Sequence, residues 1–478
     1  SSCGSRQAAM NLCRPSKSKL WQPILILVGV ATTMFYPRCR ASCFISPRSR
    51  VPKASTVTMF SSSAASYTLR SQRPISVHPR SPRGWKMARH SVSSMDDSDV
   101  VQPRFFDVAV VGGGISGLAA ISRLSRRGLR LLLVEQGRGL GGRMCTRHAN
   151  CPETEDPIAF DHGCQYFSVK AASQPNFAEE AERWLEAGVV QHWKGRIGTL
   201  TCAEDGGGLQ MSSFTAFPEE KLSSIMVGAP SMSALGKHIL GRAGLDRQAG
   251  QTVRSGGIAV KKRTRAENVQ WHSPSKRWRL QLASRTVEST MMEAEARVLV
   301  VATSANSVSR LLSTSAPDEV KGIKSPVCWA LLVAVPRPLT HIPFDGAFVA
   351  NSADAGVLAW VARDSSKPGR PGTGSTPECW VLHASAEWSS SMREASTDDV
   401  RRAMLAEFER DFGAQDVVYS EAFRWNNAFP LNPMRGKAKC VVDVERHLAL
   451  GGDWAAGDRV GDAFESGVAL ASSALDLL

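Results

Sequence analysis

The chain has 478 residues and carries 58 Lys and Arg against 44 Asp and Glu, which gives a formal net charge of +14. This excess lies in the first 95 residues, which hold 15 Lys and Arg and no Asp or Glu. The other 383 residues are nearly neutral, with 43 basic and 44 acidic side chains. The charge therefore excludes a nucleic-acid-binding surface on the folded part, and the length exceeds that of one ordinary domain.

Residues 1–95 are predicted to form a disordered targeting leader, because they are rich in Ser and Arg and lack acids, as transit peptides do. Their apolar run Ile24–Tyr36 is shorter than the roughly 20 residues that cross a bilayer, and it is typical of a signal peptide. A signal-like run before a Ser- and Arg-rich stretch resembles the two-part leaders of plastids bounded by extra membranes. The leader thus predicts a plastid (chloroplast) location, with a mitochondrial transit peptide or a secretory signal as alternatives.

Cysteine spacing and hydropathy beyond the leader restrict the partners. Seven cysteines remain there, without a Cys-x-x-Cys pair or a spacing that suggests zinc, so free thiols are expected and no metal site is predicted. No segment is long and apolar enough for a stable membrane span in the mature protein. The expected partner is a small-molecule substrate, and no feature of the sequence specifies an oligomeric state.

The folded part opens with a pattern that predicts a dinucleotide-binding turn. Phe105–Val111 is short, apolar and β-branched, as buried strands are, and the sequence GGGISG follows at Gly112–Gly117. Helical spacing of apolar residues continues to Arg127, and a second apolar strand, Leu129–Val134, ends at Glu135. A Gly-x-Gly-x-x-Gly turn with a strand before it, a helix after it and an acid ending the next strand indicates backbone that binds a diphosphate.

Each glycine of the turn, and the acid, has a physical role. Gly112 permits the tight turn, Gly114 lets a phosphate approach the backbone, and Gly117 lets the helix pack closely on the strand. The Glu135 carboxylate is expected to accept hydrogen bonds from the ribose hydroxyls of an adenosine. The spacing alone does not distinguish NAD from FAD.

Two further segments resemble motifs of the FAD-dependent amine oxidase and phytoene desaturase superfamily. Arg138–Thr146 reads RGLGGRMCT and resembles the second glycine motif, which runs along the phosphates and ribityl chain of FAD. His447–Trp454, followed by the helical pattern Gly461–Leu477, resembles the closing motif, in which Asp453 would reach the ribityl or phosphate groups. The helix start would then direct its N–H groups at the pyrimidine edge of the flavin, where negative charge develops on reduction.

Within this superfamily the renalase-like branch fits best. Phe160–Phe167 reads FDHGCQYF and resembles a segment of renalase and its bacterial and plant relatives, with Cys164 in place of Ala. The resemblance covers Phe105–Leu478 and implies non-covalent FAD that accepts a hydride from a small planar, dihydronicotinamide-like reductant or from an amine and is reoxidised by O2. It implies these cofactor-binding residues: Gly112, Gly114, Ile115, Ser116, Gly117, Glu135, Gln136, Arg138, Gly142, Arg143, Met144, Asp161, His162, Gly163, Val253, Ala302, Asp453, Gly461 and Ala463.

Chemistry of the monoamine oxidase type is not expected. Those enzymes attach FAD through a C-terminal cysteine and frame it with two tyrosines, whereas only Tyr166 and Tyr419 lie beyond the leader and nothing around Cys440 marks an attachment. Hydride transfer needs stacking and exclusion of water more than a base, so no catalytic residue is assigned. The candidates are His162, which equally suits a turn cap, and His383, Trp360, Trp388 and Trp425, residue types that are more often core than pocket.

The predicted fold class is α/β, with a discontinuous Rossmann-like FAD-binding domain of the glutathione-reductase type and a mixed α+β substrate domain. The FAD-binding domain is expected to comprise residues 105–170, 225–312 and 440–478, and the substrate domain residues 171–224 and 313–439. The segment Asp364–Glu378, dense in Pro, Gly and Ser, is expected to be a surface loop. Two other functions stay open: a plastid flavoenzyme for isoprenoid or tetrapyrrole substrates, and a non-catalytic FAD-binding assembly subunit.

Overall fold

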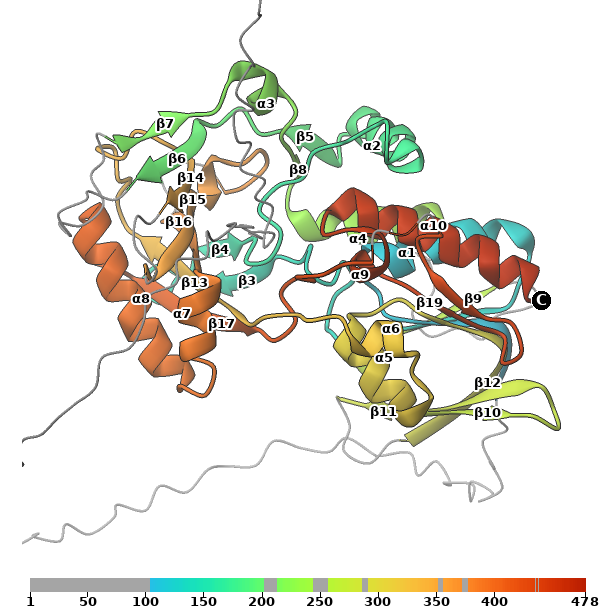
Figure 1. Cartoon of the computed structure of the whole chain (residues 1–478). Coiled ribbons are helices and arrows are strands. Elements are labelled where there is room, and N and C mark those ends of the chain that lie inside the picture. Colours follow the sequence, from blue (N-terminus) through green and yellow to red (C-terminus); the bar gives the residue numbers. More distant parts are fainter. Residues whose placement is uncertain are drawn as a thin grey trace, which may run out of the picture. The chain divides into compact units, whose positions relative to one another are not determined.

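The computed structural model describes residues 104–201, 213–243, 257–285, 291–350, 356–371, 377–434, 436 and 438–478 (Figure 1). The predicted leader and Val253 lie outside the described residues. Within them the strands form two large sheets and two small pairs.

The first sheet carries the predicted dinucleotide-binding turn. Its central strand β1 (Arg104–Val111) pairs in parallel with β12 (Met291–Val301) and β2 (Leu131–Val134). All four residues of β2 are buried, as expected for a parallel strand covered on both faces. The described strands follow the order β10-β11-β12-β1-β2-β9, with β19 parallel to β12 and β18 beside β19. The other bounds are β9 Ile258–Lys261, β10 Thr264–His272, β11 Arg277–Ser284, β18 Val441–Asp443 and β19 Leu448–Leu450.

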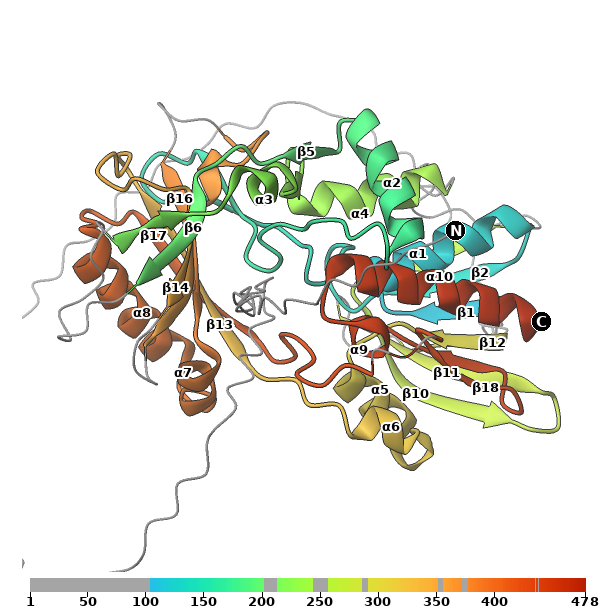
Figure 2. The same cartoon turned by 45° about the horizontal axis from the view of Figure 1, so that its top comes forward.

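Helices cover both faces of the first sheet (Figure 2). The alternation of side chains along β1 sends Val108 and Val110 to one core and Ala109 and Val111 to the other. Helices α1, α2, α4 and α10 contribute to the first core, and α5 and α6 contribute to the second. Their bounds are α1 Ile115–Leu124, α2 Pro175–Glu186, α4 Met232–Arg242, α5 Ala305–Leu312, α6 Asp318–Lys321 and α10 Val460–Asp476.

The second sheet is mostly antiparallel, in the order β17-β13-β16-β15-β14-β6-β7, with β14 parallel to β6. Helices α7 and α8 pack on one core of this sheet, and the β3–β4 hairpin packs on another through Ile158 and Phe160. The strands are β3 Arg147–Asn150, β4 Pro157–Phe160, β6 Ile197–Thr201, β7 Thr215–Ala216, β13 Cys328–Val335, β14 Gly346–Ala350, β15 Leu358–Arg363, β16 Glu378–Ala384 and β17 Tyr419–Trp425. The remaining elements are β5 Val190–His192, β8 Met226–Gly228, α3 Glu219–Ser223, α7 Ala386–Ser391, α8 Thr397–Phe412, α9 Asp453–Ala456 and the 3-10 turns η1 Ser125–Arg127, η3 Ser313–Ser315 and η4 Asp364–Ser366.

The predicted entry of strand, glycine turn, helix and strand is confirmed. Helix α1 ends three residues earlier than expected, because η1 follows it, and Gly128 then leaves the helical region with a φ of 68°. The closing helix predicted at Gly461–Leu477 is α10, displaced by one residue at each end.

Two segments pack differently from the expected division into domains. The β3–β4 hairpin was expected with the first sheet, but its apolar side chains contact β13 and β16 of the second. Helix α2 was expected in the substrate domain, but it packs on α10, with the rings of Trp184 and Phe464 5.7 Å apart. In both segments the apolar residues find partners far along the chain, which local patterns do not reveal.

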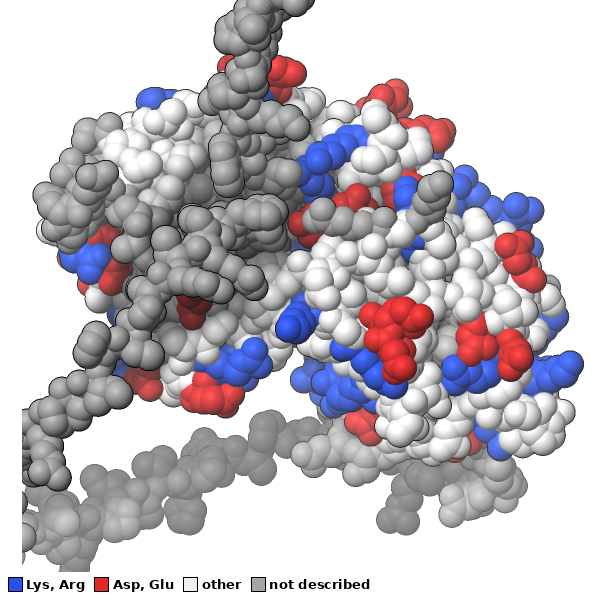
Figure 3. All heavy atoms as spheres, in the orientation of Figure 1, with Lys and Arg blue, Asp and Glu red and all other residues white. Residues whose placement is uncertain are grey.

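The surface of the described residues is mixed in charge. On the face shown in Figure 3, Lys and Arg side chains are interspersed with Asp and Glu. None of the helices in the described ranges combines the length and the apolar character that crossing a bilayer requires.

Helices α1 and α10 approach each other closely at Gly467. A Cβ at this position would overlap the Ser116 carbonyl oxygen and lie 2.8 Å from the Ala119 Cβ. The contact therefore depends on a residue without a side chain.

Gly467→Ala is expected to push α10 away from α1 and to lower the free energy of unfolding by about 1–3 kcal/mol, measured by denaturant titration. The sign is informative, because Ala in a helix normally stabilises it by roughly 0.5–1 kcal/mol relative to Gly. Gly139→Ala is the control, since a Cβ there would meet no atom within 4 Å. A Gly467→Ala variant as stable as the wild type would contradict this packing.

Candidate functional site

A cavity of about 550 Å³ opens at the carboxyl ends of β1 and β2. This is where open α/β sheets bind ligands, and the volume lies within the roughly 300–1,000 Å³ of ligand pockets. Residues from both ends of the described chain line it together with the end of β17: Val111–Gly112, Gly114–Ser116, Val134–Gln136, Gly141–Met144, Cys164, Thr264–Glu267, Ala302–Ser304, Ser307, Arg310–Leu311, Arg424–Phe429, Gly452–Asp453, Asp458–Val460 and Ala463.

The glycine turn is shaped by close backbone contacts. Gly112 has a φ of 109°, and a Cβ at Gly117 would overlap the Gly112 carbonyl oxygen, so both positions require glycine. At Gly114 a Cβ would meet no atom within 4 Å, so its missing side chain leaves space open toward the cavity. The hydroxyl oxygen of Ser116 is buried and has no hydrogen-bond partner among the described residues. The turn thus offers free space and an unpaired polar atom to a ligand.

Glu135 supports this turn from the next strand. Its carboxylate accepts hydrogen bonds from the Gly113 N–H at 2.7 Å and the Gly137 N–H at 2.5 Å. A carboxylate has about four lone-pair positions, so two acceptor positions remain for the hydroxyls of a ribose. Glu135 therefore both fixes the turn and faces the cavity.

Arg143 joins the second glycine segment to the closing motif. Its guanidinium lies 2.6 Å from the Asp453 carboxylate and donates to the Ala428 carbonyl at 3.1 Å. Burial lowers the pKa of Arg143, but the Asp453 carboxylate more than offsets this and leaves the pKa raised. Arg143 therefore stays charged beside the cavity, as a group that binds phosphate must.

Helix α10 begins at the cavity. Val460 and Ala463 line it, so the positive end of the helix dipole faces the enclosed space. Gly461 instead faces α2, because a Cβ there would lie 2.7 Å from the ring of Phe177. A positive helix end of this kind stabilises negative charge on a ligand.

The structure brings most of the predicted cofactor residues together. Gly117, Arg138, Asp161, His162, Gly163 and Gly461 do not line the cavity, and Val253 lies outside the described residues. The predicted residues that line it are Gly112, Gly114, Ile115, Ser116, Glu135, Gln136, Gly142, Arg143, Met144, Ala302, Asp453 and Ala463.

His162 lies behind the cavity rather than in its wall. Its ring stacks on that of Trp425, with centroids 5.1 Å apart, and its carbonyl accepts hydrogen bonds from His383 at 3.1 Å and from the Trp425 indole at 3.0 Å. Burial lowers the pKa of His162 to about 4 and that of His383 to about 3, so both imidazoles are neutral at pH 7. Trp425 lines the cavity, so its ring connects the buried His162 side chain to the cavity surface.

The other aromatic candidates belong to the core. Trp360 is buried and donates to the Gln165 side chain at 3.2 Å, and Trp388 packs against the core beneath α7 and α8. All five candidate side chains belong to the described residues, and of these five only Trp425 lines the cavity.

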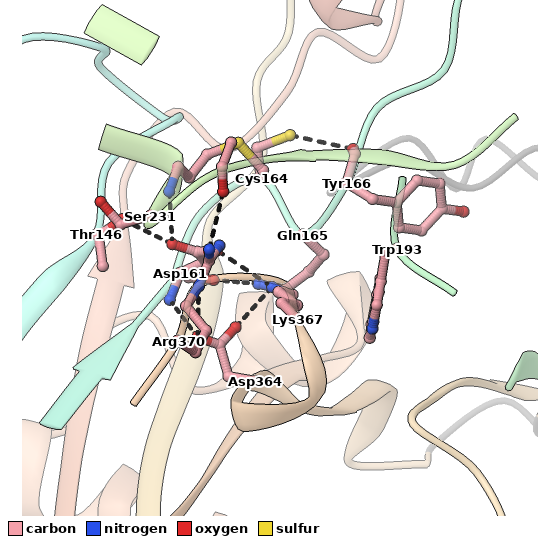
Figure 4. Close-up of polar contacts among 12 residues, drawn as sticks. Thr146, Asp161, Cys164, Gln165, Tyr166, Trp193, Ser231, Asp364, Lys367 and Arg370 are labelled. Atoms are coloured by element: carbon pink, nitrogen blue, oxygen red, sulfur yellow. Dashed lines mark hydrogen bonds and ion pairs between the residues drawn. The ribbon is translucent and has the colours of Figure 1, made fainter. Parts of the chain in front are cut away.

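A buried charge cluster of Asp161, Asp364, Lys367 and Arg370 lies behind the cavity wall (Figure 4). The expectation that residues from Asp364 onward form a surface loop is wrong for these side chains, which are buried because opposite charges satisfy one another. Lys367 lies 2.6 Å from Asp364 and 3.4 Å from Asp161, and Arg370 pairs with Asp161. The sequence signal that could have predicted these ion pairs was the recurrence of a charged residue every three positions, at Asp364, Lys367 and Arg370.

Asp161 is the centre of this cluster. Besides the two cations, its carboxylate accepts hydrogen bonds from the Thr146 hydroxyl at 2.6 Å and the Met232 N–H at 3.2 Å. Burial alone would raise the pKa of Asp161, but Arg370 and Lys367 hold it below its usual value. The same burial raises the pKa of Asp364. Asp161 was predicted to bind the cofactor. In the structure it does not line the cavity and instead anchors the segment that carries His162.

Sequence reasoning missed three parts of the cavity wall: Thr264–Glu267; Thr303, Ser304, Ser307, Arg310 and Leu311; and Asn426–Phe429. The polar Thr-Ser pair after β12 was a local signal for the second part, whereas the other two lack a motif. Among the described residues, no group of three or more His, Cys, Asp and Glu side chains is arranged to hold a metal ion.

Comparisons with known proteins agree with this fold. Residues 110–181 match the family described as NAD(P)-binding Rossmann-like domain. A carotenoid phi-ring synthase from Streptomyces griseus is 60% identical over 37 residues, which are 8% of this chain and only 7% of that protein.

Solved structures with a similar fold include several oxidases. A candidate protoporphyrinogen oxidase from Exiguobacterium sp. 255-15 has a TM-score of 0.54, with 13% identity over 78% of this chain and 99% of its own. A putrescine oxidase triple mutant has a TM-score of 0.55 with the same identity and coverage. A cyclohexylamine oxidase from Brevibacterium oxydans IH-35A has 0.53, also at 13% identity over 78% and 99% of the two chains. The chain is therefore an α/β protein with a Rossmann-like domain and the two-domain architecture of these proteins.

Asp161→Asn is expected to lower the free energy of unfolding by about 3–5 kcal/mol at neutral pH, because it leaves Lys367 and Arg370 buried with one carboxylate between them. Since the pKa of Asp161 is lowered from 3.8 to about 2 in the folded protein, the wild-type carboxylate stabilises the fold fully above its unfolded pKa and loses this effect as the pH falls through its folded pKa. The cost of the substitution should therefore shrink between about pH 5 and about pH 2 in denaturant titrations.

The control for this prediction is Asp398→Asn, which removes an exposed ion pair with Arg401 and Arg402 and should change stability little at any pH. A cost for Asp161→Asn that is as small as that of the control would refute the anchoring role.

Proposed function

We propose that the protein is a flavoprotein oxidoreductase that binds FAD without a covalent bond. It takes a hydride from a small planar, dihydronicotinamide-like reductant or from an amine, and O2 reoxidises the flavin. The single observation that carries this proposal is the shared cavity, which is lined by the glycine turn, by Glu135, by the start of α10 and by Trp425.

The residues present fit FAD. Gly114 leaves room for a diphosphate, the unpaired Ser116 hydroxyl can donate to it, and Arg143 can offset its charge. Glu135 would bind the adenosine ribose, and the start of α10 would face the pyrimidine edge of the flavin. When bound, FAD supplies the hydride acceptor, and the chain supplies its position and electrostatic surroundings.

The surroundings of Trp425 suit hydride transfer better than acid–base chemistry. His162 and Phe423 flank its ring, with centroids 5.1 and 4.9 Å away, and the neutral, buried imidazole of His162 is a poor proton acceptor at pH 7. An aromatic wall of this kind can stack on a planar ring and exclude water.

A non-covalent flavin is supported by the thiol at the cavity. Cys164 lines the cavity, and burial raises its pKa to about 12, so it is protonated and a weak nucleophile at neutral pH. Cys440 does not line the cavity. The amine oxidases among the solved structures support an oxidase in general, and the renalase-like assignment rests on the sequence Asp161–Phe167.

The purified protein should be yellow or become so with added FAD, and anaerobic addition of dihydronicotinamides should bleach the flavin absorbance. Amines and protoporphyrinogen are the comparison substrates. Bleaching by protoporphyrinogen alone would favour the tetrapyrrole alternative, and bleaching by none would favour a non-catalytic subunit.

Gly114→Ala should lower FAD affinity about ten-fold or more without changing stability, while Gly139→Ala should leave both unchanged. A folded protein that stays colourless with excess FAD would refute the proposal.

We also propose a plastid location, supported by the acid-free, Ser- and Arg-rich residues 1–95. A fusion of these residues to a fluorescent protein should accumulate in plastids in an algal or plant host. Replacing the apolar run Ile24–Tyr36 by polar residues is the matched variant, because it should block a two-part route and leave a simple transit peptide functional. Accumulation in mitochondria or secretion would contradict the location.

A further inference from the structure

The first turn of α10 carries a carboxylate directly behind the cavity wall. Arg459, Val460 and Ala463 line the cavity, and Asp462 stands between them in the chain without lining it. The Asp462 carboxylate accepts a hydrogen bond from the backbone N–H of Arg459 at 3.2 Å. A residue of the wall itself thus holds this carboxylate in contact with the wall.

The Asp462 carboxylate is held from its other side by the start of α2. The side-chain amide of Gln174, which precedes α2, donates to it at 2.7 Å, and the amide oxygen of Gln174 accepts the backbone N–H of Lys170 at 3.1 Å. Gln174 is fully buried, so these contacts fix the direction of the carboxylate. Asp462 forms no ion pair with a cation in the part of the chain that the structure describes.

Glu465, one turn further along α10, differs in its pairing. It accepts hydrogen bonds from the Asn176 side chain and the Phe177 backbone N–H, both at 3.0 Å, and its carboxylate lies 3.3 Å from the Lys439 ammonium group. The fields of Glu465 and Lys439 therefore largely cancel. Asp462 is left as the net negative charge on the side of α10 that faces α2.

A charge at this place acts on any ligand that gains negative charge in the cavity. Transfer of a hydride adds one negative charge to a flavin ring, and the positive end of α10, equivalent to about half an elementary charge, favours that change. The full negative charge of Asp462 opposes it, because like charges repel and a cavity wall screens them less than water does. The charged neighbours Asp458 and Arg459 line the same wall and are untouched by a substitution at Asp462.

On the basis of the proposed flavin function, we propose that Asp462 lowers the reduction potential of the bound flavin. Its charge cancels part of the positive helix end that favours the reduced state, so the reduced flavin is easier to reoxidise. The hydrogen bonds from Gln174 and Arg459 keep that charge at a fixed distance from the cavity.

Two substitutions that remove the same charge from the same helix test this proposal. Asp462→Asn should shift the equilibrium between oxidised and reduced flavin about ten-fold toward the reduced state, which is about 30 mV for a two-electron couple. Asp476→Asn is the control, because Asp476 is exposed and lies about 21 Å further along the helix axis, where salt screens its charge. The potential is measured by anaerobic equilibration of the flavin-loaded protein with a reference dye.

Gln174→Met separates charge from packing. It removes the donor to Asp462 and keeps the carboxylate, so it should lower the free energy of unfolding of the apoprotein in denaturant titrations. The flavin equilibrium should stay close to that of the wild type, because the charge remains. A rise in potential that came only from a loosened helix would appear in this variant as well.

The outcomes separate this inference from the proposed function. A potential that is unchanged in Asp462→Asn, or raised equally in Asp476→Asn or Gln174→Met, would overturn the inference and leave a flavin oxidoreductase in place. A folded wild-type protein that binds no flavin would overturn both. If Asp462→Asn does not retain flavin, Asp462→Ser, whose hydroxyl can still accept the Arg459 N–H, should show the same rise, and its absence there would count against the inference equally.

Discussion

Helix α1 is held between two backbone contacts that leave no room for a side chain, and the cavity depends on both. On the sheet side, Gly117 packs on the carbonyl of Gly112; on the other side, the carbonyl of Ser116 packs on Gly467 of α10. The first contact aims the amide groups of the turn at the cavity. The second fixes how far the start of α10 stands from that turn, because Val460 belongs to the same helix. The two contacts thus fix the glycine turn and Val460, which are more than 300 positions apart in the chain, around the same cavity.

The segment from Asp161 to Cys164 is fixed in an analogous way, but by charge and hydrogen bonds instead of close packing. Arg370 and Lys367 hold its first residue, and the side chains of two second-sheet strands hold the carbonyl of His162. This segment therefore couples the second sheet to the cavity wall. Buried ion pairs add little net stability compared with apolar packing, so specificity of arrangement is the better reason for this cluster.

The sequence was informative where a function requires a local pattern. The spacing of Gly112, Gly114 and Gly117, together with a strand that ends in Glu135, predicted the turn and the part of the cavity wall that it forms. It was uninformative where partners lie far apart: Asp161 and Arg370 meet across 209 positions, and no local rule joins them. Aromatic candidates failed for a related reason, because residue type does not say which face of a strand a side chain occupies. Trp360 and Trp425 look equivalent in the sequence, and only the sheet sends one of them inward and the other to the cavity.

The order of the strands has a consequence for how the protein is made. β19 is the last strand of the first sheet in chain order, and it pairs in parallel with β12, which lies two places from β2 in the sheet. Both β19 and α10 are synthesised after every other strand of the described residues. Until then β12 lacks a neighbour, the apolar face of α1 lacks its cover, and the nucleotide site has no second wall. A chain whose synthesis stops before β19 would therefore leave the apolar face of α1 exposed, and chaperones bind such surfaces.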